Sequence, residues 1–370
     1  PEGVYDDPKG GALRKTLFPR LRKHFQFENE LNLFTGTNDH GRMKFSLNIY
    51  QNNTRGKIEF DTISNLYMPQ TIDECYGTDK SKCIPGIKNE EGKWNIKGHP
   101  QRIVHVTGKE LQAIADIFAP DKDARRTPLP AIHASPLLEV LELFGKQPKR
   151  IGDMGDRVFF SAVWHETNSQ KDGTIQTKSD FPASITDCIY TGPNMGLSSC
   201  YVRSARKNSK NNSDYDRLDL TCLPADFLPR TKYQRACSEA EYARRAPDTP
   251  WEENVLNTYR IIHRGMVGSA SERTLICAIA PKGLAHINGI LSLTGQNPID
   301  MTCFAGCESS VPYDFFLKVI GKVNVNASVL DFFPIFNGED HLPIVCRALL
   351  LNCLTTYYSE LWQDCWREAY

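Results

Sequence analysis

The chain has 370 residues, of which 40% are apolar and 24% charged, and its formal net charge is zero. This length and composition are typical of a globular protein with two or three cores, and they exclude a disordered or fibrous chain. Because there is neither a run of about 18 apolar residues nor a charged-then-apolar leader, the sequence predicts no membrane span or secretion signal, and we expect a cytoplasmic protein.

The first predicted domain comprises residues 1–148. Its opening, residues 1–26, concentrates Arg and Lys and resembles a basic connector that enters from an upstream domain. Apolar and polar residues then alternate at 45–49 and 58–63, which predicts half-buried strands of a small antiparallel unit joined near Asn52 and Asn53. Thr107 predicts the start of a helix at 109–118, and Pro136 the start of another at 137–144.

The second predicted domain, residues 149–305, is rich in strands. Residues 158–164 are apolar and predict one strand. The segment 271–280 contains another apolar run. Arg273 lies near the start of the segment, and Pro281 and Gly283 follow its end. It predicts a buried strand that leads into a surface loop.

The third segment, residues 306–370, is predicted to be helical. Residues 313–320 favour a short helix. Apolar residues recur at helical spacing from 341 to 366, which predicts one long amphipathic helix at the end of the chain. Together the three segments predict an α+β fold.

The twelve cysteines are scattered without a paired framework. In a cytoplasmic chain such residues are reduced thiols, and most serve as small apolar residues. Cys303 and Cys307 have a spacing that could begin a zinc site, with His286 upstream, but no second pair has matching spacing. We therefore expect buried structural thiols and no metal site.

The segment around residues 272–288 resembles a known family. It reads Glu-Arg-Thr-Leu-Ile at 272–276, then Ile279-x-Pro281-x-Gly283 and Ala-His-Ile-Asn at 285–288. This pattern is similar to the target-recognition region of large bacterial type IIG and ISP-like restriction-modification DNA methyltransferases and their phage-defence relatives. Further blocks resemble the same region at residues 27–31, 45–50, 215–221, 224–233 and 241–251.

One stretch departs from the family pattern. Family members often carry a Gly-Pro-His-Phe-like turn followed by Gly-Asn-Pro and Lys-Thr-Pro, whereas this chain has Gly-Pro-Asn-Met-Gly-Leu at 192–197. The turn is kept but its side chains are not, so contacts that the family makes through that His or Lys cannot be carried over.

The resemblance implies a non-catalytic region that reads a short duplex sequence for an adenine-N6 methyltransferase. It implies two mixed, strand-rich lobes around a DNA-binding cleft, followed by a helical tail. Double-stranded DNA and the upstream catalytic domain of the same polypeptide are the expected partners. S-adenosylmethionine is expected to bind that upstream domain, and no cofactor is expected in this chain.

Residues 201–217 hold the side chains that base readout requires. Arg can bind guanine through two hydrogen bonds and Asn can bind adenine, while Lys and Ser suit phosphates. The alternative for this segment is a solvated, mobile surface loop. Four arginines have a different alternative, which is a surface ion pair with Asp216, Glu253 or Glu272; they are Arg217, Arg260, Arg264 and Arg273. The predicted DNA-binding residues are Arg203, Arg206, Lys207, Lys210, Arg217, Lys232, Arg260, Arg264 and Arg273.

The residues needed for methyl transfer are missing. Asn297-Pro298 lacks the aromatic residue that would stack on an extruded base, so it is interpreted as a turn, and no catalytic residue is assigned.

Two other classes of function remain open. One is a metal-dependent nuclease, using Glu91-Gly92-Lys93 with Asp73 or Asp79, although such triplets arise by chance in charged chains. His165-Glu166 is a further candidate acid–base or metal pair, and the alternative is the end of a strand. The other class is a scaffold whose acidic, aromatic tail binds a protein.

Overall fold

The structure is a computed structural model that describes residues 2–34, 43–52, 56–77, 83–119, 121–268, 271–322, 324–336 and 338–367. The chain divides into two compact units. The first unit comprises residues 1–148 with 319–321, and the second comprises 149–318 with 322–370. Both contain helices and sheets, so the predicted α+β class is confirmed.

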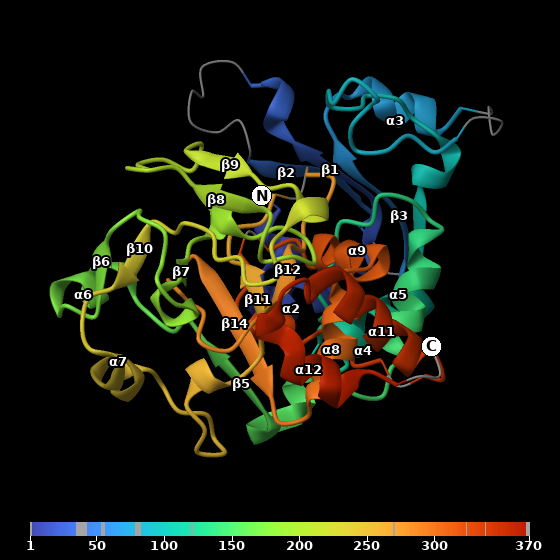
Figure 1. Ribbon diagram of the computed structural model, residues 1–370. Coiled ribbons are helices and arrows are strands. Elements are labelled where there is room, and N and C mark those ends of the chain that lie inside the picture. The colour runs from blue at the N-terminus through green and yellow to red at the C-terminus, as the bar shows by residue number, and fades with distance from the viewer. Residues whose placement is uncertain are drawn as a thin grey trace. The chain divides into compact units, whose positions relative to one another are not determined.

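The first unit is built on a four-stranded mixed sheet (Figure 1). Its strand order is β2 (Lys44–Tyr50), β1 (Leu21–Glu28), β3 (Glu59–Leu66) and β4 (Val104–Thr107). β1 is antiparallel to β2 and parallel to β3. The predicted direct pairing of the two strands that became β2 and β3 is therefore wrong, because β1 lies between them. Asn53, in the predicted turn, lies outside the described residues.

The predicted basic connector at residues 1–26 is also wrong. It folds as α1 (Gly3–Asp6), α2 (Gly11–Leu17) and most of β1. Arg14 shows why a high content of Arg and Lys did not indicate a connector. Its guanidinium is buried and donates hydrogen bonds to the carbonyl oxygens of Val4, Asp7 and Arg126. Burial lowers its pKa, and the three carbonyls replace the water that the guanidinium loses.

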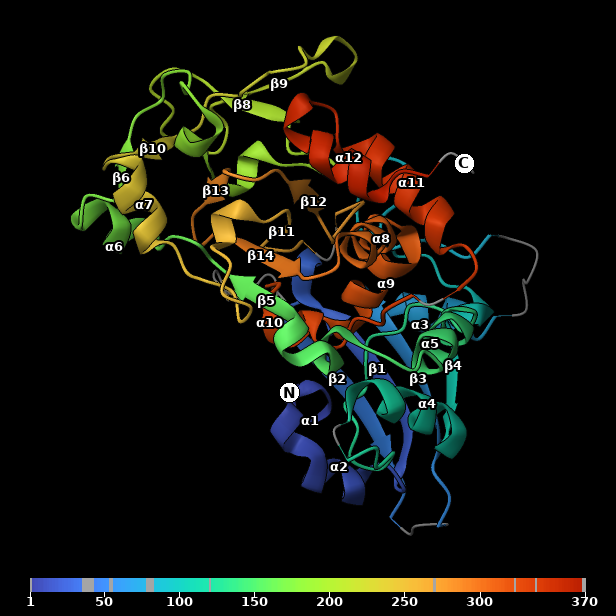
Figure 2. The same ribbon diagram turned by 60° about the horizontal axis from the view of Figure 1, so that its bottom comes forward.

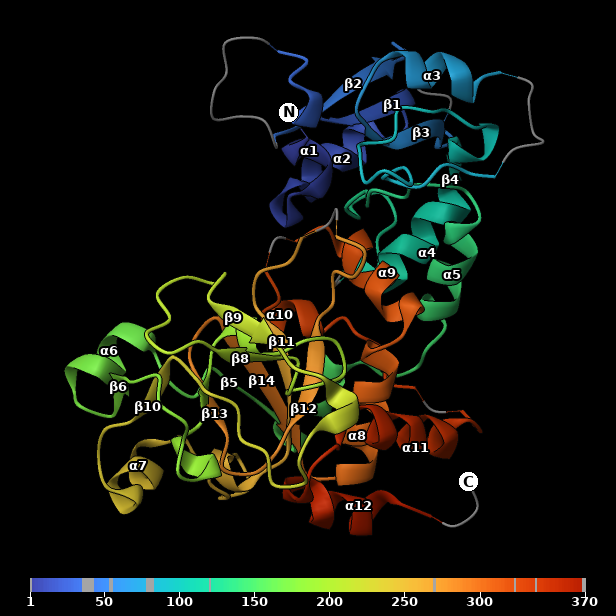
Figure 3. The same ribbon diagram turned by 45° about the horizontal axis from the view of Figure 1, so that its top comes forward.

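The two predicted helices of the first unit are confirmed. α4 (Gly108–Phe118) begins at Thr107, whose side chain forms a capping box with Glu110. α5 (Leu137–Gly145) begins after Pro136 and packs against α4 (Figure 3). A short helix, α3 (Gln70–Cys75), follows β3.

The described residues of the second unit form three sheets. The largest is antiparallel, in the order β12 (Cys277–Ala280), β11 (Arg260–Arg264), β14 (Ile290–Gly295) and β5 (Val158–Ser161). A second sheet has the order β13 (Ala285–His286), β7 (Ile189–Tyr190), β10 (Tyr233–Arg235) and β6 (Ile175–Thr177). The third is a hairpin of β8 (Arg203–Ala205) and β9 (Tyr215–Arg217).

Helices pack on the largest sheet of the second unit. α8 (Pro298–Glu308) contacts β11, β12 and β14 on one side, and α11 (His341–Asn352) and α12 (Ser359–Cys365) on the other (Figure 2). The remaining helices are α6 (Glu166–Lys171), α7 (Glu239–Arg245), α9 (Val311–Ile320) and α10 (Ala327–Leu330). The predicted helix at 313–320 is thus confirmed.

The predicted single helix at 341–366 is wrong, because it breaks between α11 and α12. The break is anchored to one residue of β12, Ile279, by two hydrogen bonds. The side-chain oxygen of Asn352 accepts a hydrogen bond from the backbone N–H of Ile279 at 3.0 Å, and the hydroxyl of Tyr358 donates to the Ile279 carbonyl at 2.7 Å. These contacts turn the chain where its apolar spacing alone would continue the helix.

A buried polar pair joins β11 to α8. His263 Nε2 lies 2.9 Å from Oε2 of Glu308, and both side chains are fully closed off from solvent. The other ring nitrogen of His263 lies 3.3 Å from the carbonyl oxygen of Leu291. Such a pair fixes how the helix sits on the sheet, since neither partner can be removed without leaving the other unpaired.

The described residues contain neither a membrane-spanning helix nor a cluster of metal-binding side chains. No helix in the described part of the chain is long and apolar enough to cross a membrane. Within the same ranges no three His, Cys, Asp or Glu side chains are grouped to hold a metal ion. Cys303 and Cys307 lie buried on α8.

Candidate nucleic-acid interface

Residues 201–217, which carry most of the predicted DNA-binding side chains, form an ordered hairpin. Its turn is organised by Asp214, whose carboxylate accepts hydrogen bonds from the backbone N–H groups of Lys210 and Asn211 at 2.9 and 2.8 Å. These two donors lower the pKa of Asp214. Asn208 adopts the left-handed conformation, with φ of 61°, which Asn tolerates better than most residues. The turn therefore holds a defined shape, unlike the mobile surface loop that was the alternative interpretation.

Two arginines face each other across this hairpin. Arg203 of β8 is directly opposite Arg217 of β9 in the strand register. Neither forms a salt bridge with any described residue. Like charges directly opposite in a sheet are destabilising, so a bound anion beside them would relieve the repulsion.

A cavity of about 460 Å³ lies in the second unit beside the hairpin. Four of the nine predicted residues line it, namely Arg203, Lys210, Lys232 and Arg264. They come from β8, from the hairpin turn, from the residue before β10 and from the end of β11. Folding thus gathers four cations that lie far apart in the sequence.

These four cations have few protein partners. Arg264 donates one hydrogen bond, from Nη2 to the carbonyl oxygen of Met195 at 2.7 Å, while its buried Nε has no partner among the described residues. The pKa of Arg264 is lowered mainly by burial and to a smaller extent by the charge of Arg203. The ammonium of Lys232 lies 5.1 Å from the ring centre of Tyr233. None of the four forms a salt bridge within the described ranges, so their charge is available to a ligand.

Among the described residues, Glu166 is the one carboxylate that lines the cavity. It accepts a hydrogen bond from the hydroxyl of Tyr233, and burial, then Glu166, raise the pKa of that hydroxyl. The backbone N–H of Glu166 donates to Oδ1 of Asn288 at 2.8 Å. His165 instead caps α6, accepting from Asn168 N–H at 3.4 Å. The predicted acid–base pair is therefore divided, with Glu166 lining the cavity and His165 capping a helix.

Three other predicted residues are exposed on the hairpin outside the cavity lining. Arg206 is bound by Asp216, whose Oδ1 lies 2.8 Å from both Nε and Nη2. Lys207 and Arg217 have no salt bridge among the described residues. All three reach solvent, and Arg206 would have to leave Asp216 to contact DNA.

The interpretation of Arg260 as a DNA contact is not supported. Its side chain is 1% exposed and donates a hydrogen bond to the carbonyl oxygen of Leu284. Burial lowers its pKa to about 10. A guanidinium closed off from solvent cannot reach a phosphate or a base edge.

Arg273 also has a structural partner. Its Nη2 donates to the carbonyl oxygens of Ser309 and Ser310 at 2.8 and 3.0 Å. These carbonyls follow the end of α8, where a cation is favourable. We therefore assign Arg273 to the α8–α9 junction.

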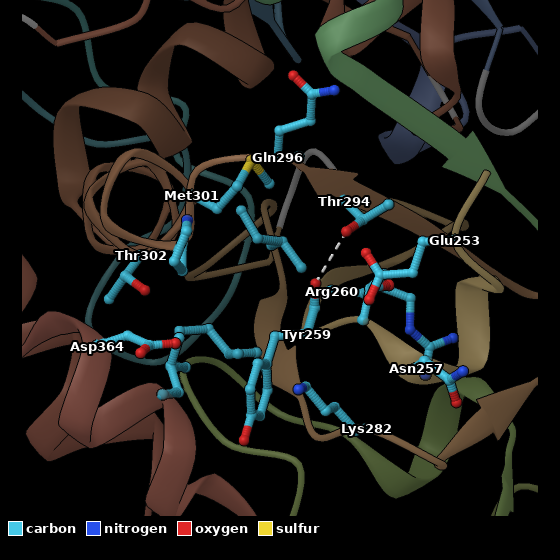
Figure 4. A pocket seen from close by; sticks show the side chains of 16 residues that line it. Glu253, Asn257, Tyr259, Arg260, Lys282, Thr294, Gln296, Met301, Thr302 and Asp364 are labelled. Carbon is cyan, nitrogen blue, oxygen red and sulfur yellow. Dashed lines mark hydrogen bonds between the residues drawn. The ribbon is translucent and has the colours of Figure 1, made fainter. Parts of the chain in front are cut away.

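A second, smaller cavity of about 150 Å³ lies around Arg260 (Figure 4). Thr294 on its wall donates a hydrogen bond to the Tyr259 carbonyl at 3.1 Å. Lys282, also on the wall, is paired with Glu360 at 2.5 Å. Because acidic side chains line this cavity as well, it lacks the excess positive charge of the larger one.

Segments on which the expected methyltransferase resemblance is based also line the larger cavity. Gly192 and Pro193 belong to the altered family turn, and Ile287 belongs to the Ala-His-Ile-Asn block. Sequence reasoning missed Thr191 and Tyr215, whose hydroxyls lie 2.8 Å apart on the wall. Tyr215 begins the family-like block at 215–221, and Thr191 directly precedes the altered turn, but neither residue type pointed to a site by itself. Of the nuclease candidate's residues, Glu91 and Lys93 form an exposed ion pair, and Asp79 lies outside the described residues.

The sequence matches no protein-family model, and no curated protein is significantly similar to it.

Proposed function

We propose that this chain recognises duplex DNA as the non-catalytic target-recognition region of a bacterial restriction-modification or phage-defence adenine-N6 methyltransferase. The catalytic, S-adenosylmethionine-binding domain would be another part of the same polypeptide. One observation carries the proposal, namely the convergence of Arg203, Lys210, Lys232 and Arg264 on a single cavity without salt-bridge partners among the described residues. Cations left unpaired in this way are the usual means of holding DNA phosphates.

The hairpin suits the recognition role. The major groove of B-DNA admits a two-stranded ribbon, and β8–β9 is such a ribbon, with Arg and Asn side chains on its strands and turn. Asn211 and Asn212 are exposed and line the cavity. Their amides can pair with adenine.

Arg264 and Lys232 are suited to positioning the protein on the DNA. Arg264 and Lys232 are half-buried at the strand ends, so their reach is short and their position is fixed by the sheet. Contacts to phosphate set the register of a protein on DNA without reading its sequence. A DNA-binding cleft between two lobes stays a prediction from the resemblance.

We expect the purified chain to bind a duplex of about 20 base pairs with an affinity that falls as salt rises. Each neutralised phosphate contributes about −0.9 to the slope of log K against log salt, so four contacts give a slope of about −3.6. Fluorescence anisotropy titrations between about 50 and 200 mM salt measure this slope. An affinity that does not change with salt, or no binding at low salt, would reject the proposal, and salt-independent capture of a protein would favour a scaffold.

A further inference from the structure

The larger cavity is a hollow, whereas a duplex edge needs only an open surface. Its volume of about 460 Å³ lies within the range of roughly 300 to 1,000 Å³ typical of small-molecule sites. A double helix cannot enter such a hollow, but one of its nucleotides can if it leaves the stack. The cavity is thus larger than phosphate contacts alone require.

Both charged and apolar side chains line the hollow. The cations Arg203, Lys232 and Arg264 can bind a phosphate group, and the apolar side chains of Pro193, Met266 and Ile287 give it walls without charge. From these features we propose that the cavity holds a single nucleotide of the bound DNA, rotated out of the helix. The inference rests on the proposed function and adds a specific ligand to it.

Arg264 would bind the phosphate group of the nucleotide. Its guanidinium makes one hydrogen bond, to the Met195 carbonyl, and its buried Nε–H has no acceptor among the described residues. A buried donor without an acceptor is costly, so a ligand oxygen there would be favourable. Arg203 lines the same cavity and its charge contributes to the lowered pKa of Arg264, so a second cation is available there for a phosphate group.

Met266 would contact the base of the nucleotide. Its side chain is 80% exposed although it lines the cavity, so its apolar surface faces water in the unbound protein. Bases rotated out of a helix are held by stacking between apolar or aromatic side chains and by hydrogen bonds to their polar edge. The amides of Asn211 and Asn212, which also line the cavity, offer both donors and acceptors for that edge.

Calorimetric titration of the whole chain tests this assignment. The probes are the four deoxynucleoside monophosphates, the matching deoxynucleosides and inorganic phosphate. We expect at least one monophosphate to bind at least tenfold more tightly than its nucleoside and than inorganic phosphate. Equal binding of phosphate and monophosphate would overturn the inference, because the cavity would then be an anion site only.

Two variants separate the phosphate contact from the base contact. Arg264→Gln should weaken binding of the monophosphate and of inorganic phosphate alike. Met266→Ala, which changes an exposed side chain and spares the fold, should weaken the monophosphate at least threefold and leave inorganic phosphate unchanged. Val311→Ala is the matched control, since Val311 is also apolar and 69% exposed but does not line the cavity. Equal effects of the Met266 and Val311 changes would contradict the base contact.

Duplex DNA containing 2-aminopurine links the two proposals. Fluorescence of this base rises when it leaves the stack, so binding of the chain should raise it at one position of the recognised site. Duplex binding without any monophosphate binding and without a fluorescence rise would overturn the nucleotide site alone. Monophosphate binding without duplex binding would instead reject the proposed function.

Discussion

Glu308→Ala is expected to lower the free energy of unfolding of the second unit by about 3 to 5 kcal/mol. The carboxylate of Glu308 lies 2.9 Å from His263 Nε2, and neither side chain reaches solvent. Removal of the carboxylate leaves a buried ring nitrogen without its partner and opens a space between α8 and β11. Urea unfolding followed by tryptophan fluorescence measures the change, since four of the five tryptophans lie in the second unit.

Glu339→Ala is the matched control for this prediction. Glu339 is an exposed carboxylate of the same unit, and its removal should change the stability by less than about 0.5 kcal/mol. His263→Ala combined with Glu308→Ala should cost less than the sum of the two single changes, because each single change already breaks the pair. A loss below about 1 kcal/mol for Glu308→Ala would show that the pair does not hold the helix on the sheet.

The second large effect concerns DNA. Lys210→Ala combined with Lys232→Ala removes two of the four cavity cations. If both contact phosphate, the slope of log K against log salt should become shallower by about 1.8, and binding should weaken alike on all duplex sequences. Anisotropy titrations on two unrelated duplexes, over the same salt range for each, measure both effects.

Lys171→Ala combined with Arg347→Ala removes the same amount of charge from exposed positions that do not line the cavity. This control should leave the slope nearly unchanged. A similar change of slope for both double variants would show that the chain responds to overall charge, and the cavity would then have no special role in binding.

Local signals in the sequence were sufficient for the helices of the first unit. A capping Thr and a helix-opening Pro act within one turn of the chain, so α4 and α5 could be predicted from their own residues. The strand β1 could not, because its residues are largely charged or polar. His24 is buried there through a 2.8 Å hydrogen bond to Thr62 of β3, a partner that only the folded sheet provides.

The candidate site shows the same limit. Arg260 and Arg264 belong to one strand, β11, and look equivalent in the sequence. One is buried against the Leu284 carbonyl, and the other lines the cavity at the end of the strand. Which arginine meets solvent depends on how the sheet is covered, and spacing along the chain does not carry that information.

The most direct test of the central claim is to map where duplex DNA contacts the chain. A duplex with 5-iodouracil in place of thymine is bound at low salt, irradiated and digested, and mass spectrometry identifies the cross-linked peptides. DNA contact at the cavity predicts cross-links in the peptides that contain residues 203–217 and 264–266. Cross-links confined to other peptides, with none from the hairpin or from the end of β11, would contradict it.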